Sequence, residues 1–222
     1  MKKILILGAG NSGKSAANLA KLQGDAVTLL DSGSPDVQID GVEVVTGKKA
    51  EAWSGPADLV IYSPGIPLGS RLDEIGITTG APKVSELAYG ASFLKCPILA
   101  VTGTNGKTTT VEMLEHCLNA AGHRAIAAGN IGLPISEVVA SGASPEILVA
   151  EVSSFQHTNL VSARQELVSV LKLCFEIVIF NSARKLDFFK LNNLLFLFSF
   201  LFFLFTFKTE FSKIHNFANG GS

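Results

Sequence analysis

Eight residues from Thr102 to Thr109 have the composition of a phosphate-binding loop. They read Thr-Gly-Thr-Asn-Gly-Lys-Thr-Thr, after the apolar run Ile98 to Val101 and ahead of a helical segment. Amides of such a loop and the helix dipole bind β and γ phosphates, Lys107 supplies a positive charge, and Thr108 supplies a hydroxyl for Mg²⁺. Val101 stands where the strict pattern requires glycine, so this is a variant of the loop.

A second chemical group is the acidic residue of Glu151-Val152-Ser153-Ser154-Phe155-Gln156, at the end of an apolar run. We expect this strand to be parallel to the one that feeds the phosphate loop. Mg²⁺ prefers oxygen ligands, so Glu151 is predicted to hold the metal directly or through water.

The first glycine-rich motif is Gly8-Ala9-Gly10-Asn11-Ser12-Gly13, between a predicted strand and a predicted helix. Glycines allow the tight turn and the close approach of backbone to a phosphate. Asp31 closes the next strand, where a carboxylate can accept hydrogen bonds from ribose or base. Taken alone, this motif suggests a nicotinamide dehydrogenase, and its glycines could also serve only the turn.

Two shorter segments follow other predicted strands. They are Ser63-Pro64-Gly65-Ile66-Pro67 and Gly129-Asn130-Ile131-Gly132. Open α/β sheets bind ligands at the carboxyl ends of their strands, so both segments are candidate ligand loops.

The elements that must position these residues alternate between strand length and helix length, which predicts an α/β fold with parallel sheets. Gly24 and Gly122 fall where two of the helices should stop. A boundary near residue 94 separates two similar strand–helix openings. The expected strands are Lys3 to Leu7, Ala26 to Leu30, Val42 to Val45, Leu59 to Tyr62, Ile98 to Val101, Ala125 to Ala128 and Ile147 to Val152, and the expected helices are Ser12 to Leu22, Val84 to Phe93 and Thr108 to Ala121.

Composition divides the 222 residues into two unlike parts. All phenylalanines except Phe93 and Phe155 follow residue 174, and all glycines except Gly220 and Gly221 lie between Gly8 and Gly142. The net charge of −1 gives no electrostatic reason to expect a nucleic acid or an anionic membrane as partner. The three cysteines have no zinc-type pair spacing and no even count that would suggest a disulfide framework, so a reducing cytoplasm is expected.

The apolar tail leaves three alternatives open. Leu191 to Phe207 is 17 residues without a charge, at the lower limit for a membrane span. The tail could instead be a buried helix or strand pair, or a translation of A/T-rich non-coding DNA joined to the gene.

In combination, the segments from Thr102 to Thr109, from Gly129 to Gly132 and from Glu151 to Gln156 resemble the Mur ligases of peptidoglycan synthesis. The Ser-Ser-Phe-Gln after Glu151, with Ser63 to Pro67 upstream, is most similar to the members that add D-glutamate. The resemblance runs from Lys2 to about Gln156. It implies a Rossmann-like domain at 1–94 for a UDP-linked substrate, part of a central ATP-binding domain at 95–160, and a tail at 161–222.

The resemblance also implies the reaction, the ligands and the residues that bind them. In these ligases ATP phosphorylates the carboxylate of UDP-N-acetylmuramoyl-L-alanine, and the amine of D-glutamate attacks the acyl phosphate. Lys107 and Glu151 would be catalytic, with Thr108 and Glu151 near Mg²⁺. ATP would contact Gly103, Thr104, Asn105, Gly106, Lys107, Thr108 and Thr109, and the UDP-linked substrate would contact Asn11, Ser12, Gly13, Asp31, Ser32, Ser63, Pro64, Gly65 and Asn130.

Two departures from the family pattern limit what is expected of this chain. The metal-linked histidine and the carbamylated lysine that follow in the family have no match after Gln156, and the amino-acid-binding domain is absent. We therefore expect a cytoplasmic monomer with impaired ligation. The alternatives are a nucleotide-binding protein without catalysis, either free or anchored by its tail, and a nicotinamide-dependent oxidoreductase.

Overall fold

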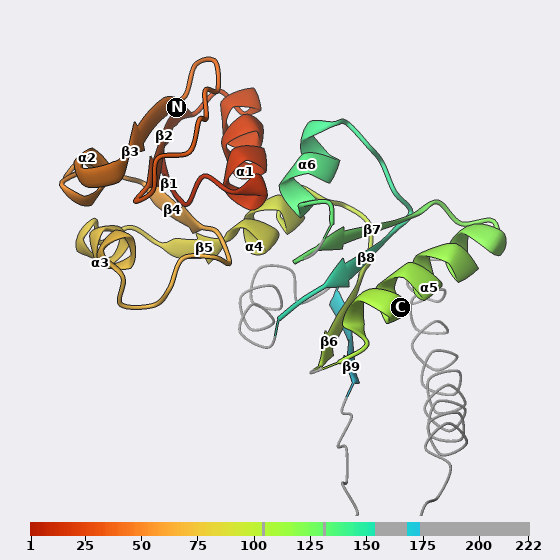
Figure 1. Cartoon of the computed structure of the whole chain (residues 1–222). Coiled ribbons are helices and arrows are strands. Elements are labelled where there is room, and N and C mark those ends of the chain that lie inside the picture. Colours follow the sequence, from red (N-terminus) through yellow and green to blue (C-terminus); the bar gives the residue numbers. More distant parts are fainter. Residues whose placement is uncertain (104, 131, 154–167, 174–222) are drawn as a thin grey trace, which may run out of the picture. The chain divides into compact units, whose positions relative to one another are not determined.

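The computed structural model describes residues 1–103, 105–130, 132–153 and 168–173 (Figure 1). The chain divides into two compact units, Met1–Cys174 and Phe175–Ser222, and every described residue belongs to the first. The predictions about the apolar tail from Leu191 to Phe207 therefore lie outside the described residues. Among the described residues, no helix is long and apolar enough to cross a membrane.

A five-stranded parallel sheet forms the first half of the described chain, in the order β3-β2-β1-β4-β5 (Figure 1). Parallel strands need crossover connections, and helices supply them here except between β2 and β3, where residues 32–42 contain no helix. The strands are β1 (Lys3–Leu7), β2 (Ala26–Asp31), β3 (Glu43–Thr46), β4 (Leu59–Tyr62) and β5 (Lys83–Ser85), and the helices are α1 (Asn11–Leu22), α2 (Gly47–Glu51), α3 (Arg71–Thr78) and α4 (Glu86–Ala91).

Both faces of this sheet are covered, which explains why β1 is apolar at almost every position. Ile4 and Ile6 point to one face and pack in a cluster with Leu19 of α1. Leu5 and Leu7 point to the other face and pack with residues of α2 and α3. The alternation of side chains along a strand thus divides one apolar run between two cores.

A second parallel sheet follows, in the order β7-β8-β6-β9. The strands are β6 (Ile98–Gly103), β7 (Ala125–Gly129), β8 (Ile147–Glu151) and β9 (Val168–Leu173), and the helices are α5 (Lys107–Ala120) and α6 (Ile135–Ala140). Ile98 and Leu148 pack in one cluster with Ile135 of α6 and Leu87 of α4. Helix α4 therefore contributes to the core of the second sheet as well as following the last strand of the first.

Most of the predicted elements are confirmed, with bounds that differ by one or two residues. The helix predicted over Val84 to Phe93 is shorter, because its first residues form β5, which pairs with β4. Gly24 and Gly122 do stop α1 and α5, with φ of +79° and +92°. The prediction missed α2, α3, β5, α6 and β9, all of which are six residues or fewer except the eight-residue α3.

Strand β9 extends the second sheet beyond β6. It pairs with β6 over its whole length, from Ile98 opposite Val168 to Gly103 opposite Leu173. These residues fall within 161–222, the segment that the sequence assigned to the tail. The ordered sheet thus continues past residue 156.

Candidate functional site

The loop between β6 and α5 brings a lysine back onto its own backbone. Gly106 has φ of +75°, a conformation that favours glycine, and directly precedes the first helical residue, Lys107. The Lys107 ammonium donates a hydrogen bond to the carbonyl oxygen of Gly103 at 2.9 Å. Asn105 and Gly106 are exposed, as is Thr109, and Thr104 lies outside the described residues.

Glu151 reaches this loop because β8 is the immediate neighbour of β6. The two strands are parallel, and Val101 pairs with Glu151 at their carboxyl ends. Thr108 Oγ1 donates a hydrogen bond to Glu151 Oε2 at 2.8 Å. The structure therefore brings together the two residues that the sequence nominated as metal ligands.

The other carboxylate oxygen of Glu151 is an unusual feature. The residue is 2% exposed, and Oε1 has no hydrogen-bond partner among the described residues. A buried polar atom left without a partner carries a free-energy cost, so such an atom calls for an explanation. A divalent cation would supply the missing partner, and a carboxylate with an adjacent hydroxyl is a donor set that suits Mg²⁺.

The segment after β7 is held against the same strand end. The backbone N–H of Asn130 donates to the carbonyl oxygen of Glu151 at 2.9 Å. Gly129 has φ of +124°, and a Cβ on it would lie 2.3 Å from that oxygen, so only glycine fits. The Asn130 side chain is exposed beside the strand end.

The first glycine-rich loop, at the carboxyl end of β1, is tightly packed upon itself. A Cβ at Gly13 would lie 1.8 Å from the carbonyl oxygen of Gly8, whereas nothing lies within 4 Å of one at Gly10. Gly13 is therefore needed for the close approach of α1 to the loop. Asn11 is exposed and Ser12 half-buried at the start of α1.

The Asp31 carboxylate binds two nearby backbone N–H groups, a role that the sequence did not reveal. Its Oδ2 accepts the backbone N–H of Ala9 at 2.7 Å, and its Oδ1 accepts that of Gly33 at 2.8 Å. The carboxylate thus orders the glycine loop and its own turn, while Ser32 beside it is exposed.

The segment after β4 joins this loop from the other side. Ser63 is buried and its hydroxyl donates to the carbonyl oxygen of Gly8 at 3.3 Å. Pro64 and Gly65 are exposed. A cavity of about 210 Å³ opens beside them, lined by Tyr62, Pro64, Ile66, Leu68, Asp73, Lys83 and Ser153.

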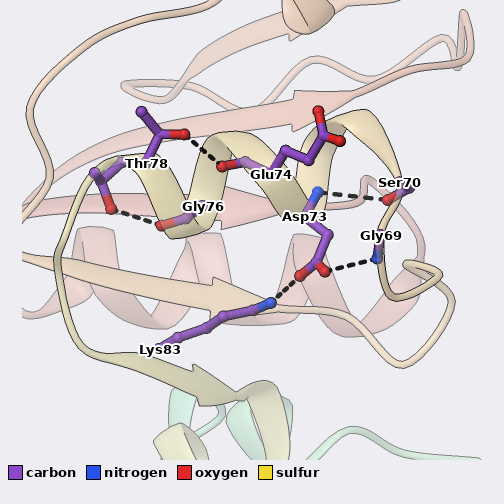
Figure 2. A network of polar contacts seen from close by, with 8 residues as sticks. Gly69, Ser70, Asp73, Glu74, Gly76, Thr78 and Lys83 are labelled. Carbon is purple, nitrogen blue, oxygen red and sulfur yellow. Dashed lines mark hydrogen bonds and ion pairs between the residues drawn. The ribbon is translucent and has the colours of Figure 1, made fainter.

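The polar wall of this cavity comes from residues that the sequence analysis missed. Figure 2 shows the Asp73 carboxylate of α3 in an ion pair with the Lys83 ammonium. The same carboxylate accepts a hydrogen bond from the Gly69 N–H at 2.8 Å. Lys83 lowers the pKa of this nearly buried carboxyl. Ser70 caps the helix by accepting the Asp73 N–H, and the Ser-x-x-Asp pattern could have revealed this helix start.

Comparison with known proteins agrees with these motifs. Residues 101–190 match the family model of the Mur ligase middle domain. The UDP-N-acetylmuramoylalanine--D-glutamate ligase of Pelotomaculum thermopropionicum is 36% identical over 180 residues, and that of Streptococcus pneumoniae strain CGSP14 is 34% identical over the same length. By these matches the chain resembles the Mur ligase family.

The alignments cover a larger share of this chain than of its relatives. The alignments cover 78% of this chain and 40% of each of these ligases, so the chain spans about two fifths of their length. The match to the Mur ligase middle domain continues to residue 190, beyond the end near Gln156 that the motifs indicated. Among solved structures, the UDP-N-acetylmuramate:L-alanyl-gamma-D-glutamyl-meso-diaminopimelate ligase of Neisseria meningitides is 21% identical, with a TM-score of 0.48, and the match covers 82% of this chain and 64% of that one.

Proposed function

We propose that this chain binds ATP with Mg²⁺ and a UDP-linked muramoyl substrate, and that it acts in the addition of D-glutamate to UDP-N-acetylmuramoyl-L-alanine. The observation that carries the proposal is the contact between Thr108 and Glu151, beside a buried carboxylate oxygen without a partner. The named relatives that share this region add D-glutamate. We place the reaction in the cytoplasm.

The proposed roles assign this loop to the phosphates of ATP. Gly103, Thr104, Asn105, Gly106 and Thr109 would surround the phosphates, whose charge suits the amino end of a helix of 14 residues. Lys107 would move its ammonium from the Gly103 carbonyl to the γ phosphate and offset the charge of the transferring group. Thr108 and Glu151 would hold Mg²⁺, which supplies further charge stabilisation when bound.

The chemistry needs ATP because a carboxylate is a poor electrophile. An oxygen of the substrate carboxylate attacks the γ phosphorus, and the bond to ADP breaks. The amine nitrogen of D-glutamate then attacks the acyl carbon, and phosphate leaves. In this proposal Asn11, Ser12 and Gly13, with Asp31, Ser32, Ser63, Pro64, Gly65 and Asn130, bind the UDP-linked substrate that carries the carboxylate.

Isothermal titration of the full chain tests the proposal with three separate ligands. We expect binding of UDP-N-acetylmuramoyl-L-alanine and of Mg²⁺-ATP, and none of NAD. Binding of ATP without the UDP-linked compound would support a nucleotide-binding protein of another kind. Binding of NAD alone would favour an oxidoreductase and contradict the proposal.

A further inference from the structure

A buried carboxylate connects the two sheets at a point away from the phosphate loop. Glu86, the first residue of α4, is 2% exposed. Its Oε1 accepts the backbone N–H of Ser136 in α6 at 2.7 Å. Burial raises the pKa of the Glu86 carboxyl. Burying an acid without an opposite charge costs free energy, so Glu86 is a poor choice for simple packing.

Helices α4 and α6 are in close backbone contact at Gly90. A Cβ at Gly90 of α4 would lie 2.6 Å from the Ser136 nitrogen and 2.8 Å from the Ile135 carbonyl carbon. Leu87 and Val138 belong to the same buried cluster around this contact. Backbone therefore meets backbone here, and the position of α6 depends on that of α4 (Figure 1).

The start of α6 is in turn tied to the end of β8. Only Leu133 and Pro134 separate the helix from the segment Gly129–Gly132. The Gly129 N–H donates to the Leu133 carbonyl oxygen at 2.9 Å, which closes the loop. Asn130 is attached to the Glu151 carbonyl oxygen by its own N–H. A shift of Ser136 would thus reach Asn130 through a short, hydrogen-bonded path.

We propose that Glu86 is a positioning residue for the UDP-linked substrate: by holding the Ser136 amide, it fixes Leu133 and Pro134 and, through the hydrogen bond between Gly129 and Leu133, places the Asn130 side chain. The inference rests on the proposed function, in which Asn130 contacts that substrate.

Hydrogen exchange on the full chain tests the structural half of this proposal without any ligand. Glu86→Ala should accelerate amide exchange about tenfold over residues 129–136, because the buried acceptor of Ser136 is lost. Exchange over β2, in the first sheet, should stay unchanged. Glu86→Gln keeps a carbonyl oxygen and should restore protection. Unchanged exchange over 129–136, or equal acceleration throughout, would overturn the inference.

A second variant covers the case in which Glu86→Ala does not fold. Glu86→Asp keeps the charge but is one methylene shorter, so its carboxylate falls short of Ser136. It should accelerate exchange over the same residues, to a smaller extent. Protection equal to the wild type in Glu86→Asp would also overturn the inference.

Ligand affinity tests the functional half. Glu86→Ala should weaken binding of UDP-N-acetylmuramoyl-L-alanine about tenfold and leave Mg²⁺-ATP affinity unchanged, and in an Asn130→Ala background it should add little, because coupled residues are not additive. Fully additive losses would show that Glu86 does not act through Asn130. If the wild-type chain binds no UDP-linked compound, the proposed function fails, and the exchange measurement still decides whether Glu86 orders the loop.

Discussion

Thr108 donates a hydrogen bond from Oγ1 to Oε2 of Glu151 at 2.8 Å, although 43 positions separate the two residues in the chain. The pairing of β6 with β8 makes this contact possible, since Val101 and Glu151 end their strands side by side. The hydroxyl and the carboxylate then face one another across the beginning of α5.

Glu151→Gln should abolish the benefit of Mg²⁺ for ATP binding. An amide is neutral and cannot offset the charge of a divalent cation as a carboxylate does. We expect Mg²⁺ to raise ATP affinity at least about tenfold in the wild type and to have little effect in the variant. Titration with ATP in the presence and absence of Mg²⁺ measures both values. Glu112→Gln, at an exposed position of α5, is the matched control and should behave as the wild type.

Lys107→Ala should weaken ATP binding by about tenfold or more, because the phosphates lose a nearby positive charge. We expect the fold to be retained, because the hydrogen bond from the ammonium to the Gly103 carbonyl lies within the loop itself. Lys95→Ala, which removes an exposed lysine, controls for the change in net charge. Equal ATP affinities in both variants would contradict the assignment of the phosphate loop.

Gly13→Ala should destabilise the first sheet, whereas Gly10→Ala in the same motif should be tolerated. The new methyl group at position 13 would meet the Gly8 carbonyl oxygen at 1.8 Å, and the one at position 10 would enter open space. We expect a loss of about 2 to 3 kcal/mol in the free energy of unfolding for Gly13→Ala. Urea denaturation of both variants measures the difference, and equal midpoints would show that the loop can relax.

Lys83→Met should lower the free energy of unfolding, because the Asp73 carboxylate loses its ion-pair partner. Lys83 lowers the pKa of Asp73 below the ordinary value of 3.8, so the pair stabilises the fold above that pH and ceases to do so as the pH falls through the lowered folded-state pKa. We expect the variant to lose about 1 to 3 kcal/mol at pH 7, since Asp73 is then buried without its partner.

The pH dependence separates this charge effect from lost packing. The difference between Lys83→Met and the wild type should shrink as the pH falls through the lowered pKa of Asp73 and this carboxyl becomes protonated. Lys21→Met is the control, because its partner Asp40 is fully exposed and that ion pair should contribute little. A difference in unfolding free energy that is constant from pH 7 to pH 2 would indicate that packing alone is responsible.

The strands and the loops that follow them were predictable because their patterns are local. An apolar run such as Lys3–Leu7 before a glycine turn specifies a buried strand through its own residues. Short elements were missed for the same reason, since α6 and β5 contain too few residues to show a period. Helix α3 has a capping pattern at Ser70 but lies in a region rich in loop residues.

The glycines, lysine and hydroxyl between Thr102 and Thr109 are adjacent in the chain, so their pattern predicts phosphate chemistry without knowledge of the fold. The partner of each carboxylate, in contrast, depends on which strands lie side by side in the folded chain. Asp31 and Glu151 look alike as acids at the ends of strands, yet Asp31 has both oxygens bound to backbone amides, whereas Glu151 keeps one without a partner among the described residues. Strand order and burial set that difference, and neither is encoded by the spacing of residues along the chain.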